Sequence, residues 1–346
     1  MEASLAASML RDTATAERVG DKAAGRLVEV SALFADELQF IEGELRAHVR
    51  DGKAPATDSA AHLLGAGGKR VRPLLALLSA ACFSGATLPA TARDTGVVAE
   101  LVHLATLLHD DVVDDGIERR GQPTSRRLWG NAVSVLAGDL LLTHALERTA
   151  RVTPGESLSD LFATLRSLVD GEVIQLRGRT RLDVSETTYF QIVTNKTASL
   201  FAWAARSGAR AAGAPNEAVA ALGAFGGHLG IAFQLVDDAL DYAGDAGTTG
   251  KALHADLREG KLTLPLLRAV AEDGSLVALL EAAREGDAAA AATLVGKVRE
   301  SRGAAHARAR AAEETQSALA ALATLPESPA RSLLAAVARE LTNRAS

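Results

Sequence analysis

The sequence predicts an all-α protein built as a single large helical bundle. Ala, Leu, Arg and Glu dominate nearly every segment, only 3% of the residues are aromatic, and alternating β-branched runs are scarce, a composition that favours helix over strand. No Pro-, Gly- or Ser-rich linker and no long run of charge divides the 346 residues, so one domain over residues 26–346 is the better interpretation. Residues 1–25 have weak apolar periodicity and are expected to form a leader or accessory helix.

The ends of the helices are predicted where Gly, Pro, Asp and Ser gather. These breaks are Gly65–Gly68, Ser84–Pro89, Gly116–Pro123, Thr153–Ser157, Gly213–Pro215, Gly244–Gly250, Asp273–Gly274 and Pro326–Pro329, and they leave helices of about 12 to 25 residues. Two uncharged stretches, Leu74–Ala92 and Ala218–Val236, are each about nineteen residues long, enough to resemble membrane spans. Their Gly, Ser, His and Gln residues indicate buried helices of a large α-protein instead.

Charge and cysteine content exclude several other classes of protein. The formal net charge is −6, and no basic, aromatic-rich surface of the kind that binds nucleic acid is apparent. Cys82 is the single cysteine, which excludes an internal disulfide and a Cys-based zinc cluster and fits a reducing compartment. The first residues lack the basic and apolar stretches of a secretory signal. We therefore expect a cytoplasmic protein without a transmembrane segment.

The first candidate site is a cluster of acids at the end of an amphipathic helix. An apolar stripe comprises Val97, Leu101, Leu104, Leu108 and Val112. Away from that stripe, within about a third of the helix circumference, are His103, Thr106, Leu107, Asp110 and Asp114, with Asp111 at the edge. Carboxylates one turn apart repel each other, so between apolar flanks they require a counter-ion. Mg²⁺ with phosphate oxygens is a natural one, whereas a solvated acidic helix end is the alternative for a cluster that stands alone.

The same Asp-Asp-x-x-Asp spacing recurs at Asp237, Asp238 and Asp241. Gln234, Asp238 and Asp241 fall on one helical face at i, i+4 and i+7, in a Gly- and Leu-rich segment that is typical of a buried helix. Two such helices facing each other would hold several Mg²⁺ ions between two carboxylate walls. That arrangement would clamp a diphosphate and stabilise it as a leaving group.

Cationic residues near both clusters would complete a diphosphate site. Gly67-Gly68-Lys69-Arg70-Val71-Arg72-Pro73 places backbone N–H groups beside three cations, and Arg119-Arg120 follows the first acids closely. Lys196-Thr197, Gly250-Lys251 and Gly260-Lys261 are weaker signals, because a single lysine is usually a surface residue. His103 shares a helical face with Asp110, where it could donate to a diphosphate oxygen.

In this order the motifs resemble the trans-polyprenyl diphosphate synthase family, also called polyprenyl synthetases, over roughly Leu27–Val270. Besides the segments above, the resemblance rests on Leu136-Ala137-Gly138-Asp139, Gly171-Glu172-Val173-Ile174-Gln175-Leu176, Lys196-Thr197-Ala198-Ser199-Leu200-Phe201 and Asp256-Leu257-Arg258-Glu259-Gly260-Lys261-Leu262-Thr263-Leu264-Pro265. The sequence departs from the family pattern at Ala252–Ala255, where small polar residues are expected.

The resemblance implies an isoprenoid-synthase helical bundle with a central cavity, usually a homodimer. The enzyme would condense an allylic diphosphate, such as farnesyl diphosphate, with isopentenyl diphosphate in a Mg²⁺-dependent reaction that uses three ions with bound diphosphate. By resemblance, the residues that hold metal on the allylic diphosphate and act in catalysis are Asp110, Asp111, Asp114, Asp237, Asp238 and Asp241. They would be assisted by Arg119, Lys196, Thr197, Gln234 and Lys251. The resemblance also assigns Lys196 a catalytic role. Isopentenyl diphosphate would be bound by Lys69, Arg72, His103 and Arg120.

In this family the bulk beneath the first aspartate helix limits product length. Ala105 and Thr106 are small, where short-chain members tend to carry aromatic residues, so the resemblance predicts a long-chain product of seven to ten isoprene units. A geranylgeranyl or farnesyl diphosphate synthase is the alternative. A class I terpene cyclase is disfavoured by the second Asp-Asp-x-x-Asp motif. A non-catalytic subunit is disfavoured because the aspartates and phosphate-binding cations are all retained, although a catalytic subunit of a heteromer stays open.

Overall fold

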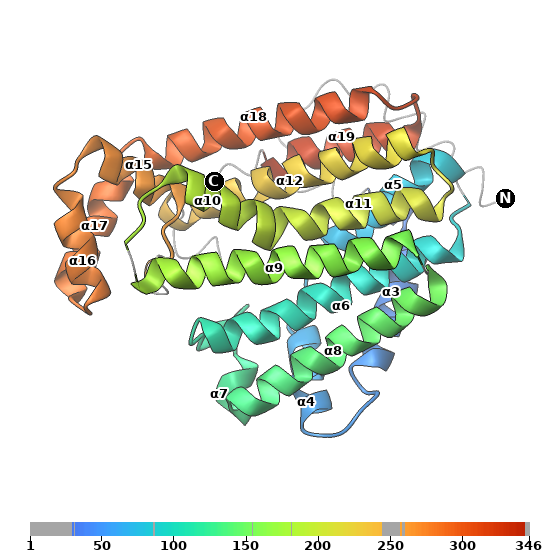
Figure 1. Ribbon diagram of the computed structural model, residues 1–346, viewed down its shortest axis with the longest axis horizontal. Coiled ribbons are helices and arrows are strands. Elements are labelled where there is room, and N and C mark those ends of the chain that lie inside the picture. The colour runs from blue at the N-terminus through green and yellow to red at the C-terminus, as the bar shows by residue number, and fades with distance from the viewer. Residues whose placement is uncertain are drawn as a thin grey trace.

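The computed structural model describes residues 30, 32–85, 87–153, 155–180, 182–243, 257 and 260–342. The predicted leader, the predicted break at Gly244–Gly250 and Lys251 lie outside these residues. The described chain is an all-α bundle, as predicted, and its single sheet is a small hairpin of β1 (Glu118–Arg119) and β2 (Gln122–Pro123). Figure 1 shows the long helices running side by side along the long axis of the molecule.

Most helices of the first half of the chain lie in the lower part of the bundle in Figure 1. Its helices are α3 (Ala35–His48), α4 (Ala56–Gly65), α5 (Val71–Ser84), α6 (Ala90–Val113), α7 (Ser125–Trp129), α8 (Asn131–Val152) and α9 (Glu156–Thr180). The breaks predicted between Gly65 and Ser157 are confirmed. The break at Gly116–Pro123 contains the hairpin, which the sequence analysis did not predict.

The second half completes the bundle and adds a small group of helices at one end. It contains α10 (Glu186–Val193), a π-helix η2 (Thr194–Ala198), α11 (Ser199–Ala211), α12 (Asn216–Ala243), α15 (Leu264–Glu272), α16 (Leu276–Arg284), α17 (Ala288–Glu300), α18 (Gly303–Ala323) and α19 (Pro329–Thr342). Helices α15, α16 and α17 gather at the left end of Figure 1. The starts of α10 and α17 were not predicted, although both carry sequence signals: the Ser185 and Asp287 side chains accept N-cap hydrogen bonds there.

The largest apolar cluster joins α5, α6, α11 and α12, with the predicted stripe residues Val97, Leu101, Leu104 and Leu108 fully buried in it. Among the described helices, α12 alone is long and apolar enough to cross a membrane. It instead packs against α11 and α18 as a core helix, as predicted for Ala218–Val236. At 28 residues it exceeds the predicted length range, because its glycines serve helix packing and do not interrupt the helix.

Glycines bring the site-bearing helices unusually close together. A Cβ added at Gly226 of α12 would lie 2.6 Å from the backbone oxygen of Phe201 in α11, and one at Gly230 would lie 2.6 Å from Cα of Ala198 in η2. On the other side of η2, a Cβ at Gly171 of α9 would lie 2.8 Å from the backbone nitrogen of Lys196. The π-helix is therefore held between α9 and α12, and π-helical turns are frequent at functional sites.

Candidate active site

The first acid row lies at the C-terminal end of α6. Asp110 and Asp111 are in its last turn, and Asp114 is the first residue beyond it, with its N–H donating to the Asp110 carbonyl oxygen at 2.7 Å. Each carboxylate contacts a cation from another segment. Lys196 Nζ lies 3.6 Å from Asp110 Oδ2, Arg119 Nε donates to Asp111 Oδ1 at 2.8 Å, and Lys261 Nζ lies 3.0 Å from Asp114 Oδ2.

Burial raises the pKa of Asp110, and the neighbouring Asp114 carboxylate raises it further, whereas Lys196 lowers it. Holding the ionised carboxylates together therefore costs free energy in the absence of an additional cation. Asp111 differs from its neighbours because its side chain is only 2% exposed and is turned toward Arg119.

The second acid row comprises Asp237, Asp238 and Asp241 on α12. One of them, Asp238, belongs to a buried hydrogen-bond chain. Asp238 is 1% exposed, and both of its carboxylate oxygens accept hydrogen bonds from protein donors. Gln234 Nε2 donates to Oδ1 at 2.7 Å, and the hydroxyl of Tyr189 donates to Oδ2 at 2.6 Å. The amide oxygen of Gln234 in turn accepts from Thr197 Oγ1 at 3.0 Å. The predicted common face of Gln234 and Asp238 is thus confirmed as a direct contact.

The π-helix η2 connects the two acid rows. Lys196 is directed toward Asp110 on α6, while the adjacent Thr197 is bonded to Gln234 on α12. Lys196 also forms an ion pair with Glu172 of α9. Burial raises the pKa of Glu172, as does Asp110, whereas Lys196 lowers it. One ammonium group therefore stands between two half-buried carboxylates.

A cationic cluster lies beside the acid rows. Its members are Lys69, Arg70 and Arg72 at the start of α5, His103 of α6, and the hairpin residues Arg119 and Arg120. A Cβ added at Gly68 would lie 2.7 Å from Arg70 Nη1 and 3.2 Å from Arg120 Nη1, so the glycine-rich loop closely approaches the hairpin. Arg70 itself is turned away into ion pairs with Glu42 at 3.0 Å and Glu100 at 2.7 Å.

The other cationic groups of the cluster repel one another, which disfavours their charged forms. Burial lowers the pKa of Arg72 to about 10, and Arg120 contributes to the lowering while Glu100 and Asp237 oppose it. The Arg72 guanidinium lies over the Phe201 ring, 4.7 Å from its centroid. Burial, followed by the charges of Arg72 and Arg120, holds the pKa of His103 well below its ordinary value, so the imidazole is neutral at pH 7 and keeps one N–H donor. An anion bound there would relieve the mutual repulsion of these cations.

Backbone strain is concentrated around these groups. The three non-glycine residues with positive φ in the described chain are Arg70 (49°), Asp115 (53°) and Arg120 (53°). Left-handed backbone at such residues costs free energy and is often found at functional sites. Here it occurs at the start of α5 and at both ends of the segment that connects Asp114 to Arg120.

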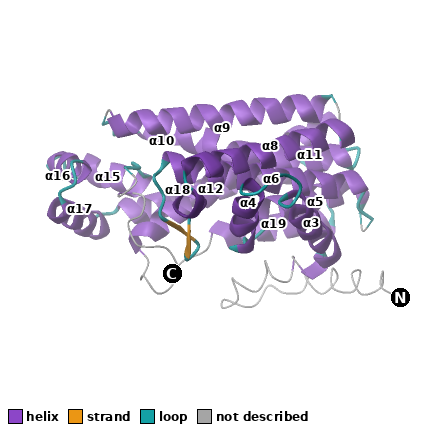
Figure 2. Cartoon of the chain, turned by 90° about the horizontal axis from the view of Figure 1, so that it is seen from below, coloured by secondary structure: helices purple, strands orange, loops and turns teal. Residues whose placement is uncertain are grey.

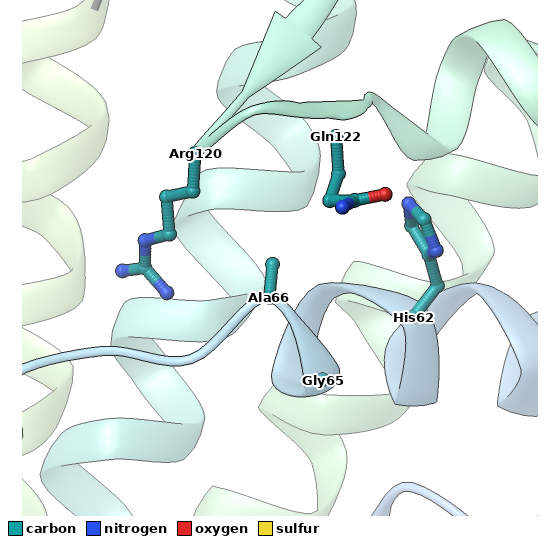
Figure 3. A pocket seen from close by; sticks show the side chains of 5 residues that line it. All are labelled: His62, Gly65, Ala66, Arg120 and Gln122. Atoms are coloured by element: carbon teal, nitrogen blue, oxygen red, sulfur yellow. The ribbon is translucent and has the colours of Figure 1, made fainter. Parts of the chain in front are cut away.

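A cavity of about 390 Å³ adjoins the cationic cluster. It lies between the end of α4 and the hairpin, and its lining residues are His62, Gly65, Ala66, Arg120 and Gln122. Figure 3 shows the Arg120 side chain on one side of this cavity and His62 with Gln122 on the other. Arg120, a member of the cationic cluster, therefore also lines the cavity.

The donor set fits a hard divalent cation bound together with a phosphorylated ligand. Carboxylate oxygens on two helices are the ligands that Mg²⁺ prefers, and Mg²⁺ usually takes only one or two of them, with phosphate and water completing the coordination. Among the described residues, no group of three or more His, Cys, Asp or Glu side chains is placed to hold a metal ion. Lys196 and Lys261 place positive charge against the first row.

The structure thus brings together most of the residues named from the sequence. Contacts join Asp110, Asp111 and Asp114 to Lys196, Arg119 and Lys261, and join Thr197, Gln234 and Asp238 to one another. Asp241 is buried on α12. The charge of Asp237 acts on Arg72, which interacts electrostatically with His103 and Arg120 in the cationic cluster. Lys69 is exposed at its edge. Thr106 is half-buried one turn before Asp110, and Ala105 is buried in the core.

Sequence reasoning gave no site role to Glu172 and Tyr189. Glu172 was noted only as part of a motif, and Tyr189 stands in no motif. The sequence signal for Tyr189 is weak. Tyr189 lies seven residues, or about two helical turns, before Lys196, and many buried helix residues without a site role share that spacing.

Comparisons with known proteins agree with this geometry. A sequence profile described as polyprenyl synthetase matches residues 54–297. The chain is 35% identical over 309 residues to heptaprenyl diphosphate synthase component 2 of Geobacillus stearothermophilus, covering 89% of this chain and 96% of that protein. It is 39% identical over 302 residues to nonaprenyl diphosphate synthase of Mycobacterium tuberculosis, covering 86% and 89%. A crystal structure of polyprenyl synthase from Caulobacter crescentus CB15, complexed with calcium and isoprenyl diphosphate, has a TM-score of 0.84 at 35% identity and covers 94% of this chain and 99% of that one.

Proposed function

Because the chain belongs to the polyprenyl synthetase family and is a trans-polyprenyl diphosphate synthase of the long-chain type, we propose specific roles for its two acid rows and its cationic cluster. The acid rows bind the diphosphate of the allylic substrate through Mg²⁺, and the cationic cluster binds isopentenyl diphosphate. The observation that carries this proposal is the position of η2, where Lys196 contacts Asp110 while Thr197 is bonded to Gln234. A single short segment therefore reaches both walls of one site.

The family is metal-dependent, and the Caulobacter relative holds calcium with its isoprenyl diphosphate. In this chain the Asp110 and Asp237 rows are the metal-binding groups, with three Mg²⁺ ions expected when diphosphate is bound. Bound there, Mg²⁺ supplies the positive charge that stabilises the departing diphosphate. Lys196 and Arg119 add cationic donors on the same side, and Thr197 and Gln234 add neutral ones.

The cationic cluster orients the second substrate. Arg72, Arg120 and the neutral His103 donate to the diphosphate of isopentenyl diphosphate, and exposed Lys69 lies at the edge of the cluster. The allylic C–O bond breaks with its electron pair leaving on diphosphate, and the double bond of isopentenyl diphosphate forms the new C–C bond. A proton is then lost, for which the released diphosphate is the acceptor. No side-chain nucleophile is needed, so the residues act through charge and position.

We propose a product of seven to ten isoprene units. The small side chains of Ala105 and Thr106 support this length, since neither has the bulk of the aromatic rings that short-chain members tend to carry there. The names of the heptaprenyl and nonaprenyl relatives agree with it. Geranylgeranyl diphosphate is the shorter alternative.

The test is to incubate the purified protein with Mg²⁺, isopentenyl diphosphate and farnesyl diphosphate and to size the dephosphorylated products by mass spectrometry. We expect a ladder that ends between seven and ten isoprene units. A stop at four units would contradict the long-chain assignment and favour geranylgeranyl diphosphate. No elongation by the chain alone would contradict self-sufficiency and point to a partner subunit, such as the name "component 2" of the Geobacillus relative indicates.

We further propose that the chain forms a homodimer through α9. An apolar stripe on this helix comprises Phe162, Val169, Val173 and Leu176, each more than two-fifths exposed. Figure 2 shows α9 along one edge of the molecule, outside the other helices. A contiguous apolar stripe on a long helix is typical of a protein–protein interface, and light scattering of the purified protein would detect the dimer.

A further inference from the structure

Tyr189 and Asp238 form the buried end of a hydrogen-bond chain that reaches the active-site face of η2. The chain runs from the Tyr189 hydroxyl to Asp238 Oδ2 at 2.6 Å, from Gln234 Nε2 to Asp238 Oδ1 at 2.7 Å, and from Thr197 Oγ1 to Gln234 Oε1 at 3.0 Å. It joins α12, which carries Asp238 and Gln234, to α10, which carries Tyr189, and to η2, which carries Thr197. Tyr189 is 5% exposed and Asp238 is 1% exposed, so both lie behind the site surface.

The direction of each hydrogen bond is determined by chemistry. An ionised carboxylate only accepts, so Asp238 requires donors on both oxygens, which Tyr189 and the amide NH₂ of Gln234 supply. That requirement orients the Gln234 amide with its oxygen toward Thr197. Hydrogen bonds to a charged acceptor in a low-dielectric interior are stronger than neutral ones. The carboxylate of Asp238 therefore restrains Gln234 and, through it, the turn that carries Thr197 and Lys196.

We infer that Tyr189 is a positioning residue of the prenyl transfer site and that Asp238 is its anchor for Gln234 and Thr197, in place of the metal-ligand role expected from the sequence motif. The inference rests on the proposed function of the two acid rows. It separates two residues of the second Asp-Asp-x-x-Asp motif: Asp237, whose charge acts on Arg72 of the cationic cluster, keeps the proposed metal role, and Asp238 serves the geometry of η2. Tyr189 then affects the reaction only through the placement of Thr197 and Lys196.

The closing experiment compares Asp237→Asn with Asp238→Asn by calorimetric titration of Mg²⁺ into protein with inorganic diphosphate, which needs no turnover. If Asp238 is an anchor, Asp238→Asn changes the half-saturating Mg²⁺ concentration by less than about threefold, while Asp237→Asn raises it by about tenfold or more, as expected for loss of a ligand. An equal and large increase in both variants would overturn the inference, because Asp238 would then be a ligand.

A kinetic cycle tests the coupling between Tyr189 and Asp238. Tyr189→Phe removes only the hydroxyl and should lower kcat by about tenfold, as for a lost positioning contact, with KM for isopentenyl diphosphate unchanged. The double variant Tyr189→Phe/Asp238→Asn should be no slower than Asp238→Asn by more than about twofold, since both act through one chain. Effects that multiply in the double variant would contradict the relay.

Tyr242→Phe is the matched control. Tyr242 is the other tyrosine of the chain and is equally buried, but its ring packs in a separate apolar cluster with Leu257 and Leu266. Its kcat should stay within about twofold of wild type, and a loss equal to that of Tyr189→Phe would show a general effect of removing a buried hydroxyl and so contradict the inference. Failure of the proposed function is distinguishable, because wild-type protein would then form no elongated product, while the Mg²⁺ titration would still separate Asp237 from Asp238.

Discussion

Asp110 shows how an active-site residue can work against the stability of the fold. Its pKa is raised by burial and by Asp114, so the folded chain holds the proton more tightly than the unfolded chain. For an acid with a raised pKa, ionisation at neutral pH disfavours the folded state. Under the proposed function, Mg²⁺ bound with diphosphate supplies the positive charge that offsets this cost.

We expect Asp110→Asn to abolish activity and to raise stability. Turnover should fall by several orders of magnitude because preorganised charge is usually the dominant catalytic contribution. In metal-free buffer at pH 7.5 the Tm should rise by about a degree or two, since a repelling buried charge is removed. Addition of Mg²⁺ and inorganic diphosphate should raise the Tm of wild type more than that of the variant. Near-normal turnover would refute the assignment of Asp110.

Thr106 is the residue at which product length can be tested. It is half-buried one turn before Asp110, and its hydroxyl donates to the His103 carbonyl oxygen at 2.8 Å. Thr106→Phe should shorten the product ladder, because a ring there would occupy the space available to the growing chain. Thr106→Val keeps the volume and should leave the ladder unchanged. An identical ladder in the Phe variant would remove Thr106 from the wall of that space.

At the scale of elements, glycine spacing on α12 determines how closely it packs against α11. A Cβ at Gly226 would lie 2.6 Å from a backbone oxygen, whereas one at the adjacent Gly227 would meet only the Cβ of Ala202 at 4.0 Å. Backbone atoms cannot move aside as a flexible side chain can. The register of α11 and α12, and hence the bond between Thr197 and Gln234, depends on Gly226.

The two glycines form a matched pair of variants. Gly226→Ala should reduce the free energy of unfolding by about 1–3 kcal/mol through overpacking. Gly227→Ala should be neutral or stabilising by up to about 1 kcal/mol, because alanine is the better helix former. Chemical denaturation measures both values, and equal effects would show that the α11–α12 contact relaxes freely.

A second element-scale feature is a charge cluster around the buried Arg148, among α3, α6 and α8. Arg148 of α8 lies against Asp94 and Glu44 at 2.5 Å each and contacts His48 Nε2 at 3.0 Å. The rings of His48 and His144 are 4.9 Å apart. Burial lowers the pKa of His48 from 6.5, and His144 and Arg148 lower it further, while Glu44 and Asp51 oppose the shift.

This cluster predicts a loss of stability in mild acid. Because the unfolded chain takes up a proton at His48 at a higher pH than the folded chain does, the free energy of unfolding falls as the pH drops below about 6.5. His48→Gln can still accept from Arg148 but does not titrate, so its Tm should decline less between pH 7.5 and 5.5. Parallel Tm profiles for the two proteins would exclude His48 as the source.

At the scale of the whole molecule, the apolar stripe of α9 is exposed in the single chain, and the proposed dimer would bury it. Val169→Lys would place a charge in the exposed stripe and should shift the protein from dimer to monomer in light scattering, since an uncompensated charge in an apolar interface is costly. Val169→Leu keeps the stripe apolar and should remain dimeric. A wild-type monomer would contradict the dimer proposal directly.

Much of the architecture follows from local rules. Helix content and most helix ends are predictable because residue preference, Gly and Pro positions and apolar periodicity act over a few residues. The starts of α10 and α17 and the small hairpin were not predicted, since isolated capping residues and a four-residue ladder leave little signal. The Arg70 ion pairs with Glu42 and Glu100 could not be predicted either, because the partners come from distant helices.

The sequence by itself determined the chemistry of the site. Two Asp-Asp-x-x-Asp rows, the glycine-rich cationic loop and Lys196-Thr197 are local patterns whose residue types indicate metal and diphosphate. Only the tertiary structure decided the contacts of each residue: which aspartates face cations, that Lys196 lies between Glu172 and Asp110, and that Tyr189 donates a hydrogen bond to Asp238. The physical reason is that side-chain type and spacing along a helix are local, whereas hydrogen-bond partners, burial and the resulting pKa shifts depend on helices that meet only when the bundle is packed.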